Sequence, residues 1–325
     1  MDVVGWTTIV VVAAALIFML LEKLLPYTKG QKIFREGFFY DFFLYTIAQS
    51  YILGLIIFGL LEYIKTNTNL YQYSLIGHWP IWVQILFFLI THDLYIYWFH
   101  RWQHNNKFLW RIHEAHHSPQ SVDWLSGSRS HTFEILINQT VEFAPIILMG
   151  AAPIVPAIKG MIDAVWGMFI HSNIDAKMGR LQYFINGPEM HRWHHSDDEG
   201  KEYQNNYGTK FAFWDWIFGT AYFPDPKVKK PNQYGIARDM PEYPLTTLSE
   251  KEKSLALKNK FIHIVVVIFK DTVSYIKQFI FAFRRFEKRE EARTTTINRE
   301  SQKEIISDNT SIEDINVLAR ENKEA

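Results

Sequence analysis

The sequence predicts an all-α integral membrane protein with about four to five transmembrane helices and a histidine-rich helical cap on the cytoplasmic side. Three observations predict this class. Several apolar segments are long enough to cross a bilayer, histidines are concentrated in short clusters after such segments, and basic residues are shared unevenly between the connecting loops. The average composition does not reveal the class, because 48 % apolar residues is ordinary for a globular protein.

The first apolar segment, residues 3–25, predicts an uncleaved transmembrane helix. At about 1.5 Å per residue it can cross a hydrocarbon core of about 30 Å. A signal peptide is the alternative, but the sequence has neither a basic N-terminal region nor a small-residue cleavage site. The second segment, residues 38–64, carries only Asp41 and Glu62 as charges and predicts a second span.

The third segment, residues 79–99, predicts a span with His92 and Asp93 in its second half. Between residues 133 and 171 the chain is again apolar, and two prolines divide it into a predicted helical hairpin, 135–151 and 154–170. Two full crossings or one shallow re-entrant pair both fit this hairpin, because four charged residues weaken it as a lipid-facing structure: Glu134, Glu142, Lys159 and Asp163.

Loop charges predict the orientation. The loop after the first span is basic, whereas the loop after the second has Lys65 alone. The first loop is therefore expected in the cytoplasm, with the N-terminus outside. Counting crossings then places His100, His171 and His191 on the cytoplasmic side, at the membrane face.

The chain is expected to have four parts. They are an N-terminal transmembrane hairpin (1–78), a histidine-bearing domain (79–224), a C-terminal segment with an amphipathic surface helix over 261–283 (225–283), and a charged, disordered tail (284–325).

Composition excludes several classes of function. Lysine plus arginine equals aspartate plus glutamate, 34 each, so a general nucleic-acid binder is not expected. Cysteine is absent, which excludes disulfides, thiolate catalysis and iron–sulfur centres. Any metal must therefore be bound by imidazoles, carboxylates or water.

Eight histidines occur at spacings that place them together on helix faces. One pair has the spacing i and i+4, and two triplets share the spacing HxxHH. These residues are His100 and His104, then His113, His116 and His117, then His191, His194 and His195.

Imidazoles that share one cavity cannot all be charged, because like charges repel strongly at low dielectric. They cannot all be neutral without partners either. A pair of metal ions resolves both problems, and a nitrogen-rich shell suits iron, zinc, copper or nickel. A histidine-rich storage or pH-sensing surface is the alternative. His171 is expected as a ninth ligand, and four residues as ligands or supporting groups: His131, His92, Asp93 and Asp175.

Five stretches carry a resemblance to a known family. They are HDLYIYWFHRWQH, RIHEAHHSPQSVDWLSGSRSH, FIHSN, PEMHRWHHS and NNYGTKFAFWDWIFGT. Together they resemble the fatty acid hydroxylase superfamily of membrane di-iron oxygenases, which includes sterol desaturases and alkylglycerol monooxygenase. The family's HxxxH box falls on His100 and His104, and its two HxxHH boxes fall on the two triplets. Some relatives have a further histidine pair before the last box; here His171 is present, and Asp175 lies near the position of its partner.

The resemblance implies an enzyme with two ferrous ions that uses O₂ to hydroxylate or desaturate an unactivated C–H bond of a lipid, sterol or fatty acyl substrate. Electrons are expected from a separate donor protein or a pterin, and the location is a bacterial inner membrane or the endoplasmic reticulum. Two other functions compete: a non-catalytic membrane protein that binds or transports metal, and a zinc-dependent hydrolase.

Overall fold

The structure is a computed structural model. It describes residues 2–68, 74–197, 204–223, 230–236 and 259–284, together with 240, 243–245, 249, 251–252 and 254. Across these ranges the regular structure is helical, and β pairing is limited to two isolated bridges, Pro26 with Ile174 and Ser196 with Tyr234. The charged tail expected over 284–325 lies, from residue 285 onward, outside the described residues.

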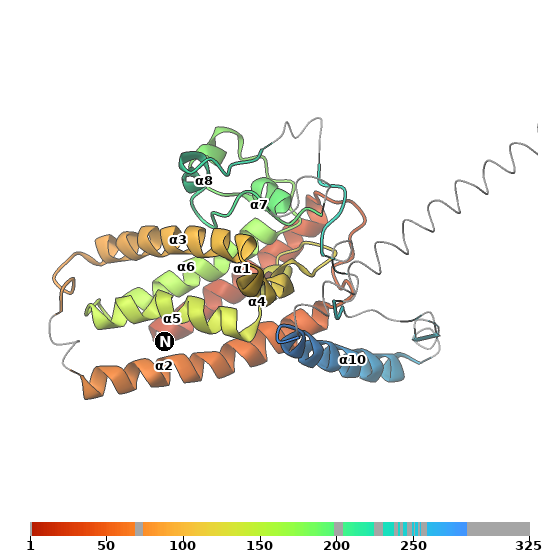
Figure 1. Ribbon diagram of the computed structural model, residues 1–325, viewed down its shortest axis with the longest axis horizontal. Helices are drawn as coiled ribbons and strands as arrows, with labels where there is room; N and C mark the ends of the chain where they lie inside the picture. Colours follow the sequence, from red (N-terminus) through yellow and green to blue (C-terminus); the bar gives the residue numbers. More distant parts are fainter. Residues whose placement is uncertain are drawn as a thin grey trace, which may run out of the picture.

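Four helical segments within the described residues are long and apolar enough to cross a membrane. They are α1 (Val3–Leu24), the continuous pair of π-helix η1 (Tyr40–Gln49) and α2 (Ser50–Asn67), α3 (Ile81–Asn105), and α6 (Ile154–His171). These segments lie side by side as a bundle (Figure 1). The predicted all-α membrane class is confirmed.

The helical hairpin predicted after residue 133 is present. Its first arm, α5 (Thr132–Leu148), begins three residues before the predicted start, where His131 caps it by accepting a hydrogen bond from the Phe133 N–H at 3.2 Å. Its second arm is α6. At 17 residues and with two glutamates, α5 is not among the four membrane-length segments. It packs between α2, α3 and α6.

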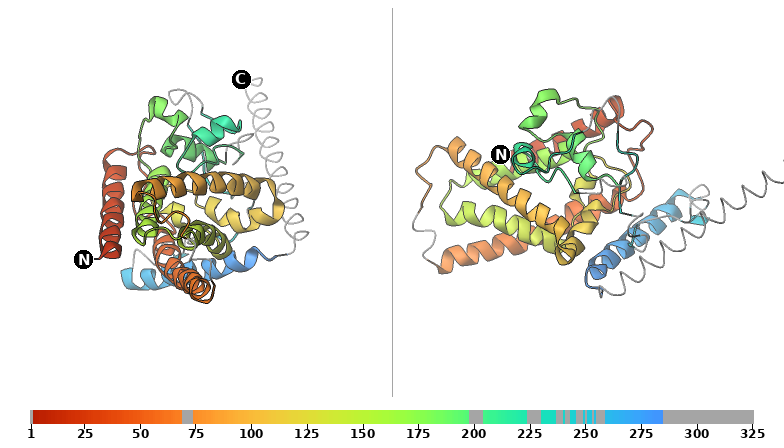
Figure 2. Two further views of the ribbon diagram at one scale, coloured as in Figure 1. Left: turned by 90° about the vertical axis from the view of Figure 1, so that its left-hand side faces the viewer. Right: turned by 45° about the horizontal axis from the view of Figure 1, so that its top comes forward.

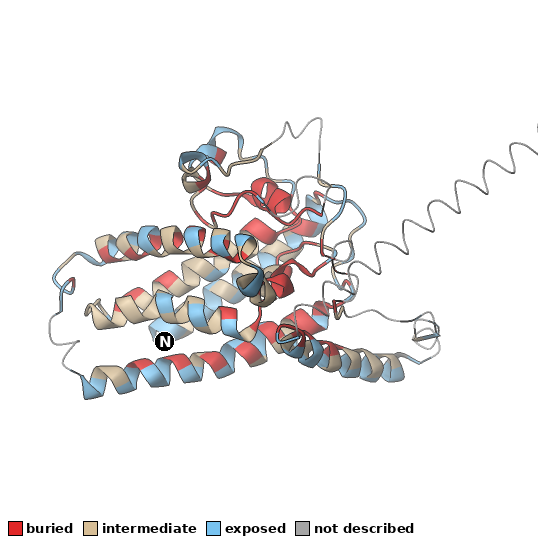
Figure 3. Ribbon diagram, viewed as in Figure 1, coloured by how far each residue is buried: buried red, intermediate tan, exposed pale blue. Residues whose placement is uncertain are grey.

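A cap of short helices covers one end of the bundle (Figure 1). It consists of α4 (Lys107–His117), η3 (Ser126–Ser128), η4 (Gly179–Tyr183), α7 (Pro188–His194) and α8 (Phe213–Ile217). Burial is greatest where α4 and α7 meet the bundle (Figure 3). All seven residues of α7 are buried.

A tight corner joins α3 to α4. Asn106 adopts an extended conformation, with φ −126° and ψ 115°, which ends α3. Its side-chain oxygen then accepts hydrogen bonds from the N–H groups of Phe108 and Leu109, at 2.9 and 3.1 Å, and so begins α4. The corner folds α4 back against the end of α3.

Buried ion pairs fix the loop of residues 118–131 to the start of η1. Asp41, with no exposed surface, pairs with Arg35 at 2.7 Å and with Arg129 at 2.6 Å. Arg35 also pairs with Asp123 at 2.6 Å. The Glu22 carboxylate of α1 accepts hydrogen bonds from the backbone of both Trp124 and Asn173, at 2.7 Å each. The N-terminal helices thereby support the two loops that flank the cap.

The amphipathic helix expected over 261–283 is α10 (Lys260–Phe281). It runs along one side of the molecule, away from α1 (Figure 2). Gln278 lies against the bundle and accepts a hydrogen bond from Tyr45 of η1 at 2.6 Å, whereas Phe261 and Phe269 on other faces of α10 are exposed.

Candidate metal centre

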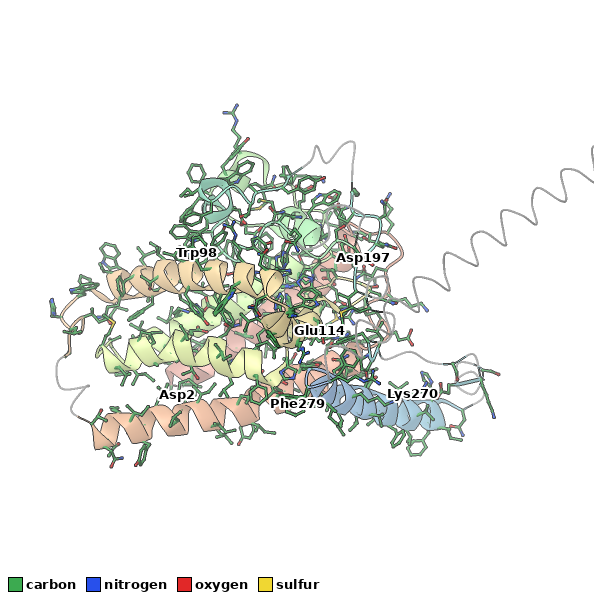
Figure 4. All side chains as sticks on the ribbon, in the orientation of Figure 1. Asp2, Trp98, Glu114, Asp197, Lys270 and Phe279 are labelled. Atoms are coloured by element: carbon green, nitrogen blue, oxygen red, sulfur yellow. The ribbon has the colours of Figure 1, made fainter. Side chains whose placement is uncertain are left out.

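Nine histidines from α3, α4, α6 and the α7 region converge at the junction of bundle and cap. They form two groups, and in each group one ring nitrogen from every residue lies within 4.8 Å of all the others. The first group is His100, His104, His113, His117 and His194; the second is His116, His171, His191 and His195. Figure 4 labels Glu114 of α4 at this junction.

The first group depends on the length of α3, which continues past the apolar span of residues 79–99 to Asn105. His100 and His104 therefore lie on the last turns of the same helix. Across the tight corner, His113 faces back toward them, and its Nε2 lies 3.0 Å from Nε2 of His100 and 3.2 Å from Nε2 of His117. His194 of α7 completes the group, with its ring 4.4 Å from that of His100.

The second group is built around His171, the last residue of α6. Its Nε2 lies 2.8 Å from Nε2 of His191, 3.2 Å from that of His195 and 3.3 Å from that of His116. The two groups are neighbours, since the rings of His117 and His195 are 4.5 Å apart. The arrangement therefore provides two adjacent nitrogen-rich positions.

Five of the nine histidines have an Nδ1 atom with a fixed partner. His113 donates to the carboxylate of Glu134 at 2.7 Å. Four others meet backbone carbonyls at 2.7–3.1 Å: His100 meets Tyr207, His116 meets Arg129, His171 meets Gly167, and His194 meets Asn205. A proton on Nδ1 leaves the Nε2 lone pair facing the interior. Metal-bound histidines are oriented in the same way.

Burial keeps these imidazoles neutral. It lowers the pKa of His113 to about 3 and that of His116 to about 4. Burial also lowers the pKa of His191, His194 and His195 well below the usual value. Neutral lone pairs that face one another at about 3 Å repel unless a cation lies between them, and ligands at right angles on one ion with bonds of about 2.1 Å are about 3 Å apart. The nine residues therefore fit a pair of metal ions.

The four remaining sequence candidates lie outside both groups. His131 caps α5 and stacks on Phe279, with ring centroids 5.2 Å apart. His92 lies near Glu142 and Asp163 instead. The Asp93 carboxylate accepts hydrogen bonds from the Thr209 hydroxyl and from the backbone N–H groups of residues 210 and 211. Asp175 is exposed and pairs with Lys177 at 2.9 Å.

Several of the groups that orient the histidines could not be predicted from the sequence, because they are backbone carbonyls. One side chain that supports them is Asp215. It accepts hydrogen bonds from the N–H groups of Tyr207 and Gly208, at 2.7 and 2.8 Å, and so holds the Tyr207 carbonyl against His100. Arg192 is buried with its guanidinium 3.8 Å from the Tyr27 ring centroid, so it is not a membrane anchor.

A cavity of about 280 Å³ opens onto the metal centre. His100, His113, His116, His171 and His191 form one end of its wall. The remainder comes from α3, α5, α6, the loop residues 127 and 130, and residues 209–210. It includes both apolar side chains, such as Ile96 and Phe99, and charged ones, such as Glu142 and Lys210.

Comparison with known proteins agrees with this geometry. Residues 85–220 match the family model of fatty acid hydroxylase, a region that contains all nine histidines of the centre. The ornithine lipid hydroxylase OlsE of Rhizobium tropici is 28 % identical over 227 residues, which cover 67 % of this chain and 68 % of that protein.

Two animal relatives are similar over shorter regions. Human alkylglycerol monooxygenase is 29 % identical over 136 residues, 42 % of this chain and 30 % of that protein. Rat methylsterol monooxygenase 1 is 29 % identical over 133 residues, 40 % of this chain and 44 % of that protein. The match thus spans less than half the length of either animal relative. No solved structure is significantly similar to the chain. Over residues 85–220, this chain is similar to the fatty acid hydroxylase family.

Proposed function

We propose that this protein is a membrane-bound di-iron oxygenase that hydroxylates an unactivated C–H bond of a lipid. The observation that carries the proposal is the pair of adjacent histidine groups, eight of whose nine members are buried, at a cavity inside a membrane-length bundle. The named relatives, which include lipid and sterol hydroxylases and monooxygenases, support the same reaction class.

The balance of the proposed reaction sets what the protein must supply. One oxygen atom of O₂ enters the C–H bond, and the other leaves as water with two electrons and two protons. Desaturation would instead remove two hydrogens from the substrate, with the same two electrons and two protons, and release two waters. Two iron ions, when bound, would supply the oxygen activation.

The protein's own residues would bind the two metal ions and position the substrate. Nine imidazoles would hold the two ions, and Glu134 orients His113 through its Nδ1–H. The cap excludes water from the centre, since all of the histidines on α7 are buried. The cavity wall would hold the substrate carbon beside His100 and His191. Electrons are expected from a separate donor protein or a pterin, because the chain has no cysteine for an iron–sulfur centre.

The test is a comparison of lipids from cells that express the protein with lipids from cells that express a His113→Ala variant, both grown under ¹⁸O₂. We expect one lipid class to gain a single ¹⁸O atom with the intact protein only. A lipid that instead loses two hydrogens would favour desaturation. A purified protein that binds metal, combined with no change in any lipid class, would favour the alternative. That alternative is a non-catalytic membrane protein that binds or transports metal.

A further inference from the structure

A second polar layer lies inside the bundle, beyond the metal centre. Three helices each carry an ionisable residue eight positions from a residue of the centre: His92 before His100 on α3, Glu142 after Glu134 on α5, and Asp163 before His171 on α6. Eight residues of α-helix correspond to about 12 Å. The three side chains meet, since their ligand-type atoms all lie within 4.8 Å of one another.

Lys159 already provides the cation of this layer. Its ammonium group, with no exposed surface, lies 3.0 Å from His92 Nδ1, 2.8 Å from Glu142 Oε1 and 2.6 Å from Asp163 Oδ2. These three contacts use all of its N–H donors. A third metal ion is therefore not needed here.

The carboxyl groups of the layer outnumber its ammonium groups. Lys210 pairs with Asp163 at 2.9 Å and lies 3.8 Å from Asp93. The cluster then holds three carboxyl groups, of Asp93, Glu142 and Asp163, against the two ammonium groups of Lys159 and Lys210. An excess of carboxylate in a low-dielectric interior favours the entry of a cationic group or a proton.

Several buried polar atoms on the same cavity wall have no hydrogen-bond partner among the described residues, and three of them bear on the ligand. They are His92 Nε2, Trp166 Nε1 and Glu134 Oε2. Because His92 Nδ1 accepts from Lys159, its Nε2 carries the proton and is a donor, as is the Trp166 N–H; the glutamate oxygen is an acceptor. The wall thus offers both donors and acceptors, and each costs free energy if it stays unpaired.

We propose that this cavity binds the polar headgroup of a lipid, one that carries an ammonium group together with an amide or carboxyl oxygen, rather than a hydrocarbon chain. The volume of about 280 Å³ suits one headgroup and not a whole lipid. The ammonium group of the lipid lies toward the carboxyl groups of Asp93, Glu142 and Asp163. Its amide or carboxyl oxygen accepts hydrogen bonds from the N–H groups of Trp166 and His92. The inference rests on the proposed function, and it places the hydroxylated carbon in the headgroup or directly beside it.

Binding tests the inference without turnover. The full chain in detergent is titrated with N-dodecanoyl-ornithine and, separately, with methyl dodecanoate, which has the same chain and no ammonium group. We expect the first to bind at least about tenfold more tightly. Trp166→Phe removes one unpaired donor, breaks no hydrogen bond among the described residues and keeps an aromatic ring beside Phe169, so it should weaken only the first ligand, about fivefold. The matched control is Trp98→Phe, an exposed tryptophan outside the cavity wall, which should change neither affinity.

Equal binding of the two ligands, or equal binding to Trp166→Phe and to the unchanged protein, would overturn the inference and indicate a cavity that holds a chain or water only. Fragmentation of the ¹⁸O-labelled lipid gives an independent result. Label in the headgroup fragment is expected. Label far along an acyl chain would overturn the inference while the proposed function stands, whereas absence of label from all lipids would count against the function itself.

Discussion

Five imidazoles of the metal centre are oriented by the atom that their Nδ1 meets, so a single substitution near that atom can move one ligand. His171 is the most constrained case, because Gly127 of η3 lies directly against its ring. A Cβ atom added at Gly127 would lie 2.5 Å from His171 Nδ1 and 2.7 Å from its Cγ. A Cβ atom does not approach another heavy atom this closely without a shift, and the backbone of η3 is held by a hydrogen bond from the Ser126 N–H to Asp123.

We therefore expect Gly127→Ala to displace the His171 ring and to weaken metal binding by the second group. About half of the bound metal should be lost, as measured by mass spectrometry of the purified protein. The control is Gly160→Ala on α6, where the added Cβ would meet only Phe143 at an ordinary distance of 3.6 Å. Retention of full metal content by Gly127→Ala would contradict the assignment of His171.

The grouping of the clustered histidines could be predicted from the sequence, because the spacings i, i+3 and i+4 determine which side chains share a helix face. The sequence did not reveal which atoms orient them. The carbonyls of Tyr207 and Asn205 have no sequence signal, because every residue has a carbonyl. The polar layer was visible in the sequence only as charges that weaken a lipid-facing hairpin; that Lys159 and His92 meet depends on how α3 packs against α6.

At the scale of elements, the ion pairs around Asp41 connect η1 to the loop that begins and ends beside the metal centre. Asp41→Asn would leave the buried guanidinium of Arg129 without its carboxylate. Removal of one partner from a buried pair costs about 3–5 kcal/mol. We expect the free energy of unfolding in detergent to fall by that amount, as measured by denaturant titration monitored through tryptophan fluorescence.

The matched control is Glu62→Gln on α2. Its partner Lys65 is 3.5 Å away and the Glu62 side chain is 67 % exposed, so the change should be about 0–1 kcal/mol. Similar effects for the two variants would mean that the Asp41 pairs do not hold the loop.

Element boundaries were the weaker part of the sequence prediction. The third apolar span was expected over residues 79–99, with His100 and His104 on one helix face after it, and α3 continues to Asn105 as one helix that carries both. Polar residues continue a helix when tertiary contacts satisfy them, and here the contacts come from α4 and α7. Asn106, a good capping residue, was the signal for the true end.

At the scale of the whole molecule, the ends of α3 and α6 and the start of α5 all lie at the capped end of the bundle (Figure 1). This agrees with the prediction that the clustered histidines share one side; that the side is cytoplasmic remains our proposal from the loop charges. The absence of cysteine allows a direct measurement, because any introduced thiol is unique.

We expect Arg180→Cys, exposed in the cap, to react with an impermeant maleimide only after the cell membrane is opened, and His78→Cys, exposed at the other end of the bundle, to react in intact cells. The reverse pattern would place the cap outside. Equal reactivity of both in intact cells would contradict a bundle that crosses the membrane.

The central claim is that nine imidazoles hold two metal ions in adjacent positions, and counting iron in purified variants tests it most directly. The unchanged protein should bind about two irons per chain. His104→Ala, in the first group, and His191→Ala, in the second, should each retain about one, and the double variant should retain none. One iron in the unchanged protein, or two in either single variant, would contradict the account.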